Sequence, residues 1–496
     1  MNLNSIYTVK INEEAFIVNS ALTASKTAVV RYFDKDGDEY FSRKYGVIEP
    51  SYIYEKINNG SELDISGCYI HGFSLSEYRT ENGIDDVTKV SIQQVNATGS
   101  FFDSSSIIDF SMAIFEKDAN FTDTHFGKGT VSFHKSVFKG LVNFSKAYFG
   151  KGDADFQFTN FGNCDVTFEE SKFHFGNVTF VNCIFGNGTT NFKKVTFNDG
   201  KVDFHFSQFG EGHKIFDQCD FGGGEVDFKR CDFGAGKSDF RRIQFGNGKV
   251  TFEESIFTSG KVNFKSSNFG HGEVNFHMVN FGTDSAIFDN AKFGTGSVSF
   301  YRSISSQLSF IECELETFVD LRVDKCGYLN LTDCINRDII QLQDTKGRAK
   351  VSVLNFTGMR NLGQLYLDWN ESNIFDIIYN QKEKTTNKQK SEQFRILKEN
   401  FHNLGQYDDE DYAYVEFKRH ELRAKTEEAI ITNSANKFWA YPRTAFEYFV
   451  FDKIGLYATN PVRVLLSSIL IYIAFSLTYF ALPHFEKGSE IVQSVS

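Results

Sequence analysis

Few residues in this chain stand at spacings that support catalysis or metal binding. The 496 residues include 11 His and 8 Cys, and no two histidines form the HExxH pair that binds zinc on a helix. His134, His205 and His277 each follow a phenylalanine of a regular repeat. We expect all three to be exposed and to lie alone. The sequence therefore predicts no catalytic residue, no cofactor-binding residue, no metal ligand and no cofactor.

One acidic run resembles a calcium loop. Residues Asp34–Asp38 read Asp-Lys-Asp-Gly-Asp, but an EF-hand loop needs its glycine at the sixth position and a glutamate at the twelfth. Gly37 is the fourth residue of the run. We interpret the run as the turn of a β-hairpin.

Two columns of phenylalanine are the main sequence pattern from which the elements that would position any site can be predicted. Each column has a period of twelve residues, and a fixed period of this kind indicates a solenoid. The bulk of the protein is therefore a repetitive shape, and its function is to be sought in surfaces and attachments. The first column is Phe144, Phe156, Phe168, Phe180, Phe192, Phe204, Phe216, Phe228, Phe240, Phe252, Phe264, Phe276, Phe288 and Phe300, and the second runs from Phe149 to Phe293.

Within each repeat a small residue and then Asp or Asn precede the bulky residue. Examples are Val202-Asp203-Phe204 and Cys219-Asp220-Phe221. This arrangement resembles the pentapeptide-repeat family, and the resemblance implies a right-handed, four-sided (quadrilateral) β-helix. Along an extended chain the bulky residue and the small residue two before it point to the same side, which here is inward.

The chain departs from the plain family pattern by two extra residues in every second pentapeptide, usually as Gly-x-Gly. Glycine supplies the positive φ that a tight corner needs. Two such 12-residue double repeats are then expected to make one coil of 24 residues. The solenoid is predicted over residues 61–370, most regularly over 110–300. Its weaker ends are marked by Ile65, Ile70 and Leu75 before it and by Leu315, Leu321, Leu331, Phe356, Leu362 and Leu367 after it.

The cysteines fit the repeat as structural residues. Cys183, Cys219, Cys231 and Cys313 occupy the small inward position, where a free thiol behaves as a small apolar group. Inward thiols two coils apart would be on the order of 10 Å from one another, beyond disulfide reach. A reducing, cytoplasmic setting is predicted.

The charge pattern argues against a nucleic-acid partner. The net charge is -12, yet the regular part of the solenoid has nearly equal numbers of acidic and basic residues. Some pentapeptide-repeat proteins resemble duplex DNA and bind DNA gyrase. Here opposite charges fall on neighbouring coils, which favours pairing within the wall over imitation of phosphate, so a DNA-mimic function is the less favoured alternative. The ladder reads Glu169-Glu170, Lys193-Lys194, Asp217-Gln218 and Arg241-Arg242.

Both ends of the chain differ from the repeat. Residues 1–60 contain alternating apolar runs and are predicted to form a small β-rich cap, which a solenoid needs at its open edge. No secretory signal is evident, because the apolar run Ala15–Val18 is short and follows two glutamates. Residues 371–390 are predicted to be a linker, and residues 391–430 a helical hairpin with a break at Gly405.

The last part of the chain predicts a membrane attachment. Residues 464–482 carry no charge and would span about 28 Å as a helix, close to the ~30 Å hydrocarbon core of a bilayer. An aromatic interfacial segment is predicted at 431–463 and a short tail at 483–496. Arg443, Lys453 and Arg463 precede the span and Lys487 follows it, so we expect a single-pass inner-membrane protein with its N-terminal bulk in the cytoplasm.

The C-terminal arrangement is similar to membrane-attached bacterial pentapeptide-repeat proteins. In some relatives a pore loop and a second membrane helix follow, and neither a TVGYG-like filter nor a second span is found here. We expect a non-enzymatic scaffold that presents a rigid rod to unknown protein partners, with a possible homo-oligomer formed through the membrane helix. The alternative is the regulatory part of a two-helix ion-channel-like membrane protein.

Overall fold

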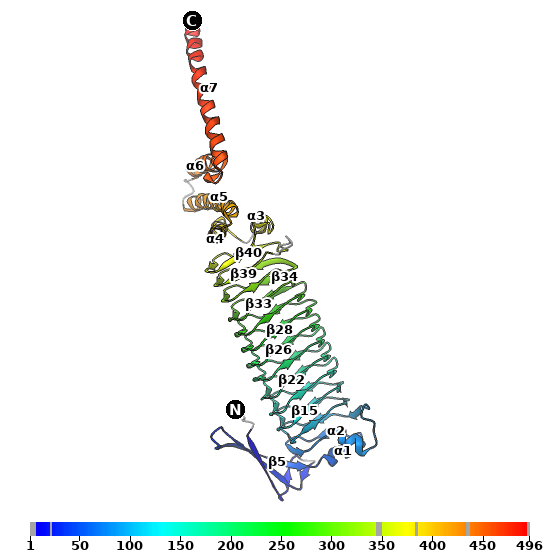
Figure 1. Cartoon of the computed structure of the whole chain (residues 1–496). Helices are drawn as coiled ribbons and strands as arrows, with labels where there is room; N and C mark the ends of the chain where they lie inside the picture. The colour runs from blue at the N-terminus through cyan, green and yellow to red at the C-terminus, as the bar shows by residue number, and fades with distance from the viewer. Residues whose placement is uncertain (1–5, 20–21, 344–349, 382–384, 433–436, 494–496) are drawn as a thin grey trace. The chain divides into compact units, whose positions relative to one another are not determined.

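The computed structural model describes residues 6–19, 22–343, 350–381, 385–432 and 437–493, and gives no side-chain description beyond residue 480. Two compact units divide the chain. The first comprises residues 1–354 and 362–367, and the second comprises residues 355–361 and 368–496. Figure 1 shows that the first unit is a β-solenoid whose short strands stack coil upon coil.

Each coil of the solenoid contributes short parallel strands to four ladders, which form its four walls. One ladder consists of β11 (Ile107–Asp109), β15 (Thr130–Ser132), β19 (Ala154–Asp155), β22 (Val178–Thr179), β24 (Val202–Asp203), β26 (Val226–Asp227), β28 (Val250–Thr251), β30 (Val274–Asn275), β33 (Val298–Ser299), β36 (Val319–Asp320), β39 (Ile339–Gln341) and β42 (Gln364–Tyr366). A second consists of β6 (Leu63–Asp64), β9 (Val95–Asn96), β13 (Ala119–Asn120), β17 (Val142–Asn143), β20 (Val166–Thr167), β23 (Thr190–Asn191), β25 (Lys214–Ile215), β27 (Ser238–Asp239), β29 (Val262–Asn263), β31 (Ser285–Ile287), β34 (Ile304–Ser309) and β37 (Lys325–Asn330).

The other two walls are strands at the ends of the solenoid and single bridges in its middle, such as Thr196 with Asp220. The third wall comprises β7 (Cys68–His71), β10 (Phe101–Asp103), β14 (His125–Phe126), β18 (Tyr148–Phe149) and β21 (Lys172–Phe173), and later β32 (Lys292–Phe293), β35 (Glu314–Leu315) and β38 (Ile335–Asn336). The fourth comprises β8 (Val90–Ile92), β12 (Ala113–Phe115) and β16 (Val137–Phe138).

The register confirms the predicted coil length. Val178 pairs with Val202 and Val202 with Val226, so one coil takes 24 residues in the regular part. The coil is one residue shorter before it, since Val131 pairs with Ala154. This shortening agrees with the shorter second step between phenylalanines seen there in the sequence.

Stacked phenylalanine rings fill the solenoid core. Phe168 and Phe192, one coil apart, stack with ring centroids 4.8 Å apart and an interplanar angle of 3°, while Phe180 meets Phe168 edge-on at 5.6 Å. All three rings are fully buried. Burial of one such ring contributes about 1.5 to 3 kcal/mol and each ring pair about 0.5 to 1.5 kcal/mol more. The ladder of rings therefore outweighs the weak local propensities of glycine-rich turns.

The glycines of the Gly-x-Gly corners serve a purpose that the sequence analysis did not give them. Gly246 has a positive φ of 68°, as expected, but Gly248 does not. A Cβ atom on Gly248 would lie 1.9 Å from the carbonyl oxygen of Gly224 on the preceding coil. Glycine is thus required at this position because the backbones of successive coils approach too closely for any side chain.

The weak ends of the predicted solenoid deviate at two positions. Leu75 is buried but begins helix α2 (Leu75–Glu81) instead of a wall, because Ser74 caps that helix by accepting the Glu77 N–H. Leu362 was predicted to point inward and is 58% exposed. Residues 344–349 of the predicted solenoid lie outside the described residues.

The N-terminal strands form an antiparallel sheet that continues one wall. β1 (Tyr7–Asn12), β4 (Thr27–Phe33) and β5 (Glu39–Ile48) pair in this order, and the end of β5 pairs in parallel with β7. Asp34 Oδ1 accepts the N–H groups of Asp36 and Asp38, so the acidic run is the predicted hairpin turn. The short hairpin β2 (Phe16–Ile17) and β3 (Thr23–Ala24) and helix α1 (Pro50–Asn58) complete the region.

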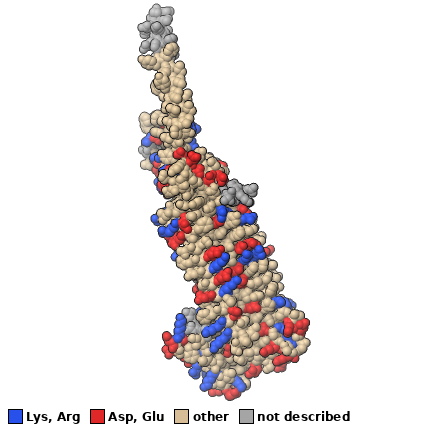
Figure 2. Space-filling view, viewed as in Figure 1, with Lys and Arg blue, Asp and Glu red and all other residues tan. Residues whose placement is uncertain are grey.

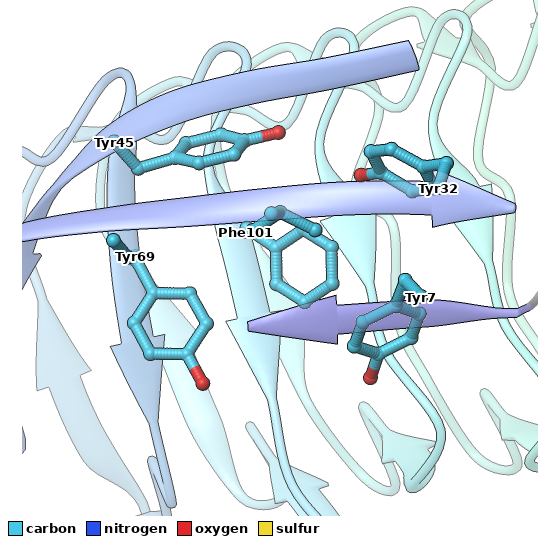
Figure 3. Close-up of a cluster of buried hydrophobic side chains, with 7 residues drawn as sticks. Tyr7, Tyr32, Tyr45, Tyr69 and Phe101 are labelled. Atoms are coloured by element: carbon cyan, nitrogen blue, oxygen red, sulfur yellow. The ribbon is translucent and has the colours of Figure 1, made fainter. Parts of the chain in front are cut away.

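The antiparallel sheet covers an aromatic stretch of the wall. Tyr7, Tyr32 and Tyr45 come from the sheet, and Tyr69 and Phe101 come from the wall (Figure 3). Tyr7 meets Phe101 edge-on at 5.1 Å, and Tyr45 meets it at 5.9 Å. The rings bury one another, which fixes the sheet on the solenoid.

The second unit is helical. α4 (Asn387–Leu404) and α5 (Tyr407–Thr432) form the hairpin, and Gly405, with a φ of 71°, ends α4. Inside the unit, Gln393 of α4 accepts the Phe356 N–H and donates to Thr357 Oγ1. The short strands β40 (Leu354–Asn355) and β41 (Arg360–Asn361) are at its boundary.

The predicted linker is shorter than residues 371–390. Helix α3 (Ile374–Tyr379) lies within it, and α4 begins at Asn387 behind a capping box between Thr386 and Gln389. Buried Ile374 and Ile378 anchor α3, but an apolar run this short gives no clear helical period in the sequence. Residues 382–384 lie outside the described residues.

The chain then forms α6 (Lys437–Glu447), the π-helix η2 (Tyr448–Ile454), the 3₁₀ turn η3 (Leu456–Ala458) and α7 (Pro461–Gln493). α7 begins three residues before the predicted span and continues into the predicted tail. Pro461 stands at the start of α7, where its missing N–H has no helical partner.

Candidate functional site

The three repeat histidines are not alone on the wall, contrary to the sequence prediction. His134 Nδ1 lies 3.5 Å from Asp155 Oδ2, and His277 Nδ1 lies 4.0 Å from Glu253 Oε1. Both side chains are about one-third exposed. The stacking of coils places the residue after an inward Phe beside outward residues of the next or preceding coil. The spacing of residues within one coil does not show these neighbours.

His205 stands in a group with Asp203 and Asp227, whose potential ligand atoms lie within 4.8 Å of one another. Asp203 Oδ1 accepts the His205 N–H, and its other oxygen lies 3.2 Å from Lys201 Nζ. Asp227 Oδ1 accepts the Lys229 N–H at 2.8 Å. Hydrogen bonds of the wall and one lysine thus account for both carboxylates, and we assign no metal to this group.

The charge ladder pairs within the wall, as the sequence predicted. Lys193 and Lys194 contact Glu169 and Glu170 on the preceding coil at 3.6 and 3.2 Å, and Arg242 contacts Asp217 at 2.7 Å. Figure 2 shows both signs of charge interspersed over the visible face of the solenoid. Each exposed pair contributes at most about 1 kcal/mol, but together they leave no extended field of one sign on this ladder.

The repeat cysteines are buried and inert. Cys231 is 1% exposed, and its Sγ donates to the carbonyl oxygen of Phe204 at 3.0 Å. Burial raises the pKa values of the Cys183 and Cys231 thiols well above the ordinary value, so the thiolate, which is the reactive form, is suppressed. Cys219 and Cys313 are buried in the same way.

A buried histidine that the sequence analysis did not single out lies under the N-terminal sheet. His125 is 3% exposed, and its Nδ1 lies 2.9 Å from Tyr32 Oη. Burial lowers the pKa of His125 to about 4, so the ring is neutral at neutral pH. The signal was available in the sequence, because the outward position before Phe126 carries rings on successive coils, at Phe101, His125 and Tyr148, before it becomes Lys172.

In the C-terminal unit a salt bridge joins α5 to the π-helix. The Arg419 guanidinium donates from Nε and Nη2 to the two oxygens of Asp452, which is 1% exposed, and it also contacts Glu416. The bonds to Asp452 raise the pKa of Arg419, which keeps it charged. This buried ion pair fixes the π-helix, where the apolar region starts, to the helical hairpin.

Beyond this salt bridge the surface is apolar and uncovered. Phe438 and Trp439 of α6 are 76% and 75% exposed, and Phe446 and Phe449 are 66% and 60% exposed. Pro461–Phe480 of α7 is long and apolar enough to cross a bilayer, and none of its most apolar window is buried against the described part of the chain. A helix of the core of a soluble protein would be mostly buried, so this exposure favours contact with lipid or another chain.

Comparisons of the chain with protein-family models, with curated proteins and with solved structures find no significant match.

Proposed function

We propose that the protein is a non-enzymatic, membrane-anchored scaffold of the pentapeptide-repeat type, which presents a rigid cytoplasmic β-solenoid to protein partners. One observation carries the proposal: after Arg463, residues 464–480 of α7 form an apolar, charge-free stretch that is exposed along its most apolar window. The anchor is a single pass through the inner membrane of a bacterial cell, with the N-terminal bulk in the cytoplasm.

The residues before the span support this orientation. Trp439, Phe446 and Phe449 are exposed rings of the kind enriched at the level of lipid headgroups. Arg463 Nη2 donates to the Lys453 carbonyl oxygen at 2.6 Å, so Arg463 near the start of α7 lies beside Lys453 of the π-helix. Cationic residues on this flank are retained on the cytoplasmic side.

The solenoid supports the scaffold part of the proposal. Its core is a continuous stack of rings, so its walls are rigid. Because charges on the wall are paired with one another, contacts with a partner depend on shape and on exposed apolar side chains. Phe158 and Phe206, 47% and 42% exposed, lie two coils apart on one corner and offer such a contact. The partner is a protein, and α7 offers a route to a homo-oligomer in the membrane.

Fractionation of cells tests the anchor. Removal of residues 464–496 is expected to move the protein to the soluble fraction, because α7 is the apolar span of the described chain. The matched comparison uses Leu470→Arg with Ile473→Arg in the span against Ile431→Arg on α5, which is also an exposed apolar residue. Membrane retention of the truncated chain after a carbonate wash would contradict the anchor and point to the rings around Phe446.

A further inference from the structure

A cavity of about 540 Å³ lies within the C-terminal unit. This volume is within the range of small-molecule sites. Trp369 and Phe375 line the cavity from the segment around α3, and Leu456 and Asn460 line it from the turn before α7. Helix α5 supplies the rest of the polar lining, and three segments that are distant in the sequence therefore meet around this cavity. The α5 residues that line it are Asp408, Asp411, Tyr412, Val415, Glu416 and Arg419.

The lining residues of α5 follow one face of the helix. They are separated by steps of three and four residues, which places their side chains one above another along the helix axis. At 1.5 Å per residue, Asp408 and Asp411 are about 4.5 Å apart along the axis, and Asp408 and Glu416 are about 12 Å apart. The cavity therefore presents its carboxylates along a line and not at a single point.

The lining carries an excess of negative charge. It has three carboxylates and one cation, and that cation, Arg419, is already held by Asp452 at 2.7 Å and by Glu416 at 2.6 Å. Asp408 and Asp411 form no salt bridge in the described part of the chain. Burial and the charges of its acidic neighbours raise the pKa of Asp411, so the protein alone disfavours its charged form. The cavity therefore matches a cation and offers no free cation to an anionic group.

An aromatic wall faces the same cavity and points to an organic cation. The rings of Trp369 and Tyr412 stack with centroids 5.8 Å apart and an interplanar angle of 26°. The Trp369 N–H donates to Asp409 Oδ2 at 3.1 Å, which fixes the wall to α5. Acidic residues at the start of a helix are common without a ligand, because the helix dipole stabilises them. Aromatic faces beside them attract cations and also pack against methylene groups, which an acidic cluster alone does not do.

We propose that this cavity binds a linear polyamine, with ammonium groups beside Asp408, Asp411 and Glu416 and the methylene chain against the rings of Trp369 and Tyr412. The terminal nitrogens of spermidine are separated by nine bonds, about 11 Å when extended, which matches the ~12 Å from Asp408 to Glu416 along α5. A metal ion has no apolar part for the rings to cover, and a zwitterionic lipid headgroup would place its phosphate among carboxylates. The site goes beyond the scaffold function proposed above and does not depend on it.

Calorimetry with the full-length chain in detergent at physiological salt tests the proposal, with spermidine as the probe and Mg²⁺ and glycerophosphoethanolamine as separate arms. We expect spermidine to bind at least tenfold more tightly than either, because Mg²⁺ cannot use the rings and the headgroup carries a phosphate. Equal or tighter binding of Mg²⁺ would overturn the organic part of the proposal. Equal or tighter binding of the headgroup would assign the cavity to a lipid and overturn the polyamine. Absence of spermidine binding would overturn the site.

A charge variant separates the cavity from general attraction to an acidic chain. Asp411→Asn is expected to weaken spermidine binding by about tenfold. The melting temperature of the ligand-free variant should stay the same or rise, because burial and the neighbouring carboxylates disfavour the charge that it removes. Glu428→Gln is the matched control, since Glu428 is an exposed carboxylate of the same helix that does not line the cavity. Equal losses for the two variants, or a lower melting temperature of Asp411→Asn with unchanged affinity, would overturn the assignment.

A ring variant tests the aromatic wall. Tyr412 is 49% exposed, and Tyr412→Leu keeps an apolar side chain on α5 while it removes the ring face, so we expect spermidine binding to weaken several-fold. Tyr407→Leu is the matched control, because Tyr407 is an exposed ring of the same helix, 67% exposed, outside the cavity. Unchanged affinity with Tyr412→Leu, or an equal loss with Tyr407→Leu, would overturn the role of the rings.

Discussion

Replacement of one glycine in a solenoid corner tests how closely the coils approach each other. The corner at residues 222–224 holds three glycines, and Gly224 does not have a positive φ. A Cβ atom on Gly224 would lie 2.1 Å from the carbonyl oxygen of Gly200 and 2.9 Å from that of Asp199. Both neighbours are backbone atoms, so no side chain can move to relieve the overlap.

The expected cost of Gly224→Ala follows from this overlap. A Cβ and a carbonyl oxygen need roughly 3.3 Å, so the two coils must separate by about 1 Å at this corner. Overpacking of this kind costs about 1 to 3 kcal/mol, and each backbone hydrogen bond lost between the coils adds about 1 kcal/mol. We expect a total of about 3 to 5 kcal/mol, with a melting temperature lower by roughly 5 to 15 °C.

The adjacent Gly223 provides the matched control. A Cβ there would meet only the carboxylate of Asp199, at 3.0 Å, and that side chain can shift. Gly223→Ala is expected to change stability by less than about 1 kcal/mol, since the loss of freedom in the unfolded chain offsets the small displacement. Thermal unfolding followed by circular dichroism measures both variants. Equal shifts for Gly223→Ala and Gly224→Ala would refute the requirement for close approach.

Three other predictions follow from the same structure. Phe228→Asp places a carboxylate in the ring stack at a cost of several kcal/mol, whereas Lys229→Glu next to it costs under about 1 kcal/mol, and comparable losses of folded protein would disprove the assignment of faces. The pKa of His125 is lowered to about 4 from an unfolded value near 6.5, so its neutral form stabilises the fold above pH ~6.5, and roughly 3 kcal/mol is lost as the pH falls to 4. His125→Phe should therefore show a smaller drop in melting temperature between pH 7 and pH 4.5, and an unchanged drop would contradict the burial argument. Alkaline phosphatase fused after Ser496 is expected to be active and a fluorescent protein fused there dark, and the opposite pair would reverse the orientation.

The solenoid could be predicted from the sequence because each coil repeats the same physical requirement. Phe204 and Val202 recur at a fixed period, and the period together with the four sides that the family resemblance implies gives the coil length, the inward faces and the pairing of charges between neighbouring coils. The Gly-x-Gly corners were located correctly, but their cause was given only in part. Close approach depends on the backbones of two neighbouring coils, and the sequence of a single corner describes only one of these backbones.

The parts that could not be predicted depend on contacts between distant segments. The approach of Tyr32 to His125 joins residues 93 positions apart, and no local pattern states that β4 folds over this wall. The pairing of Arg419 with Asp452 is of the same kind, at 33 positions. Helix α3 was missed for a different reason, since its few apolar residues are too short a run to give a clear helical period.

The outward residues that directly precede each phenylalanine of the second column nevertheless indicate where the N-terminal sheet must end. Rings at Tyr69, Phe101, His125 and Tyr148 would expose a long apolar strip on the first coils if nothing covered them, and the sheet buries each of them below a tenth. At the next coil the column becomes Lys172, whose charge favours contact with water over contact with a covering strand. The cover therefore ends between Tyr148 and Lys172.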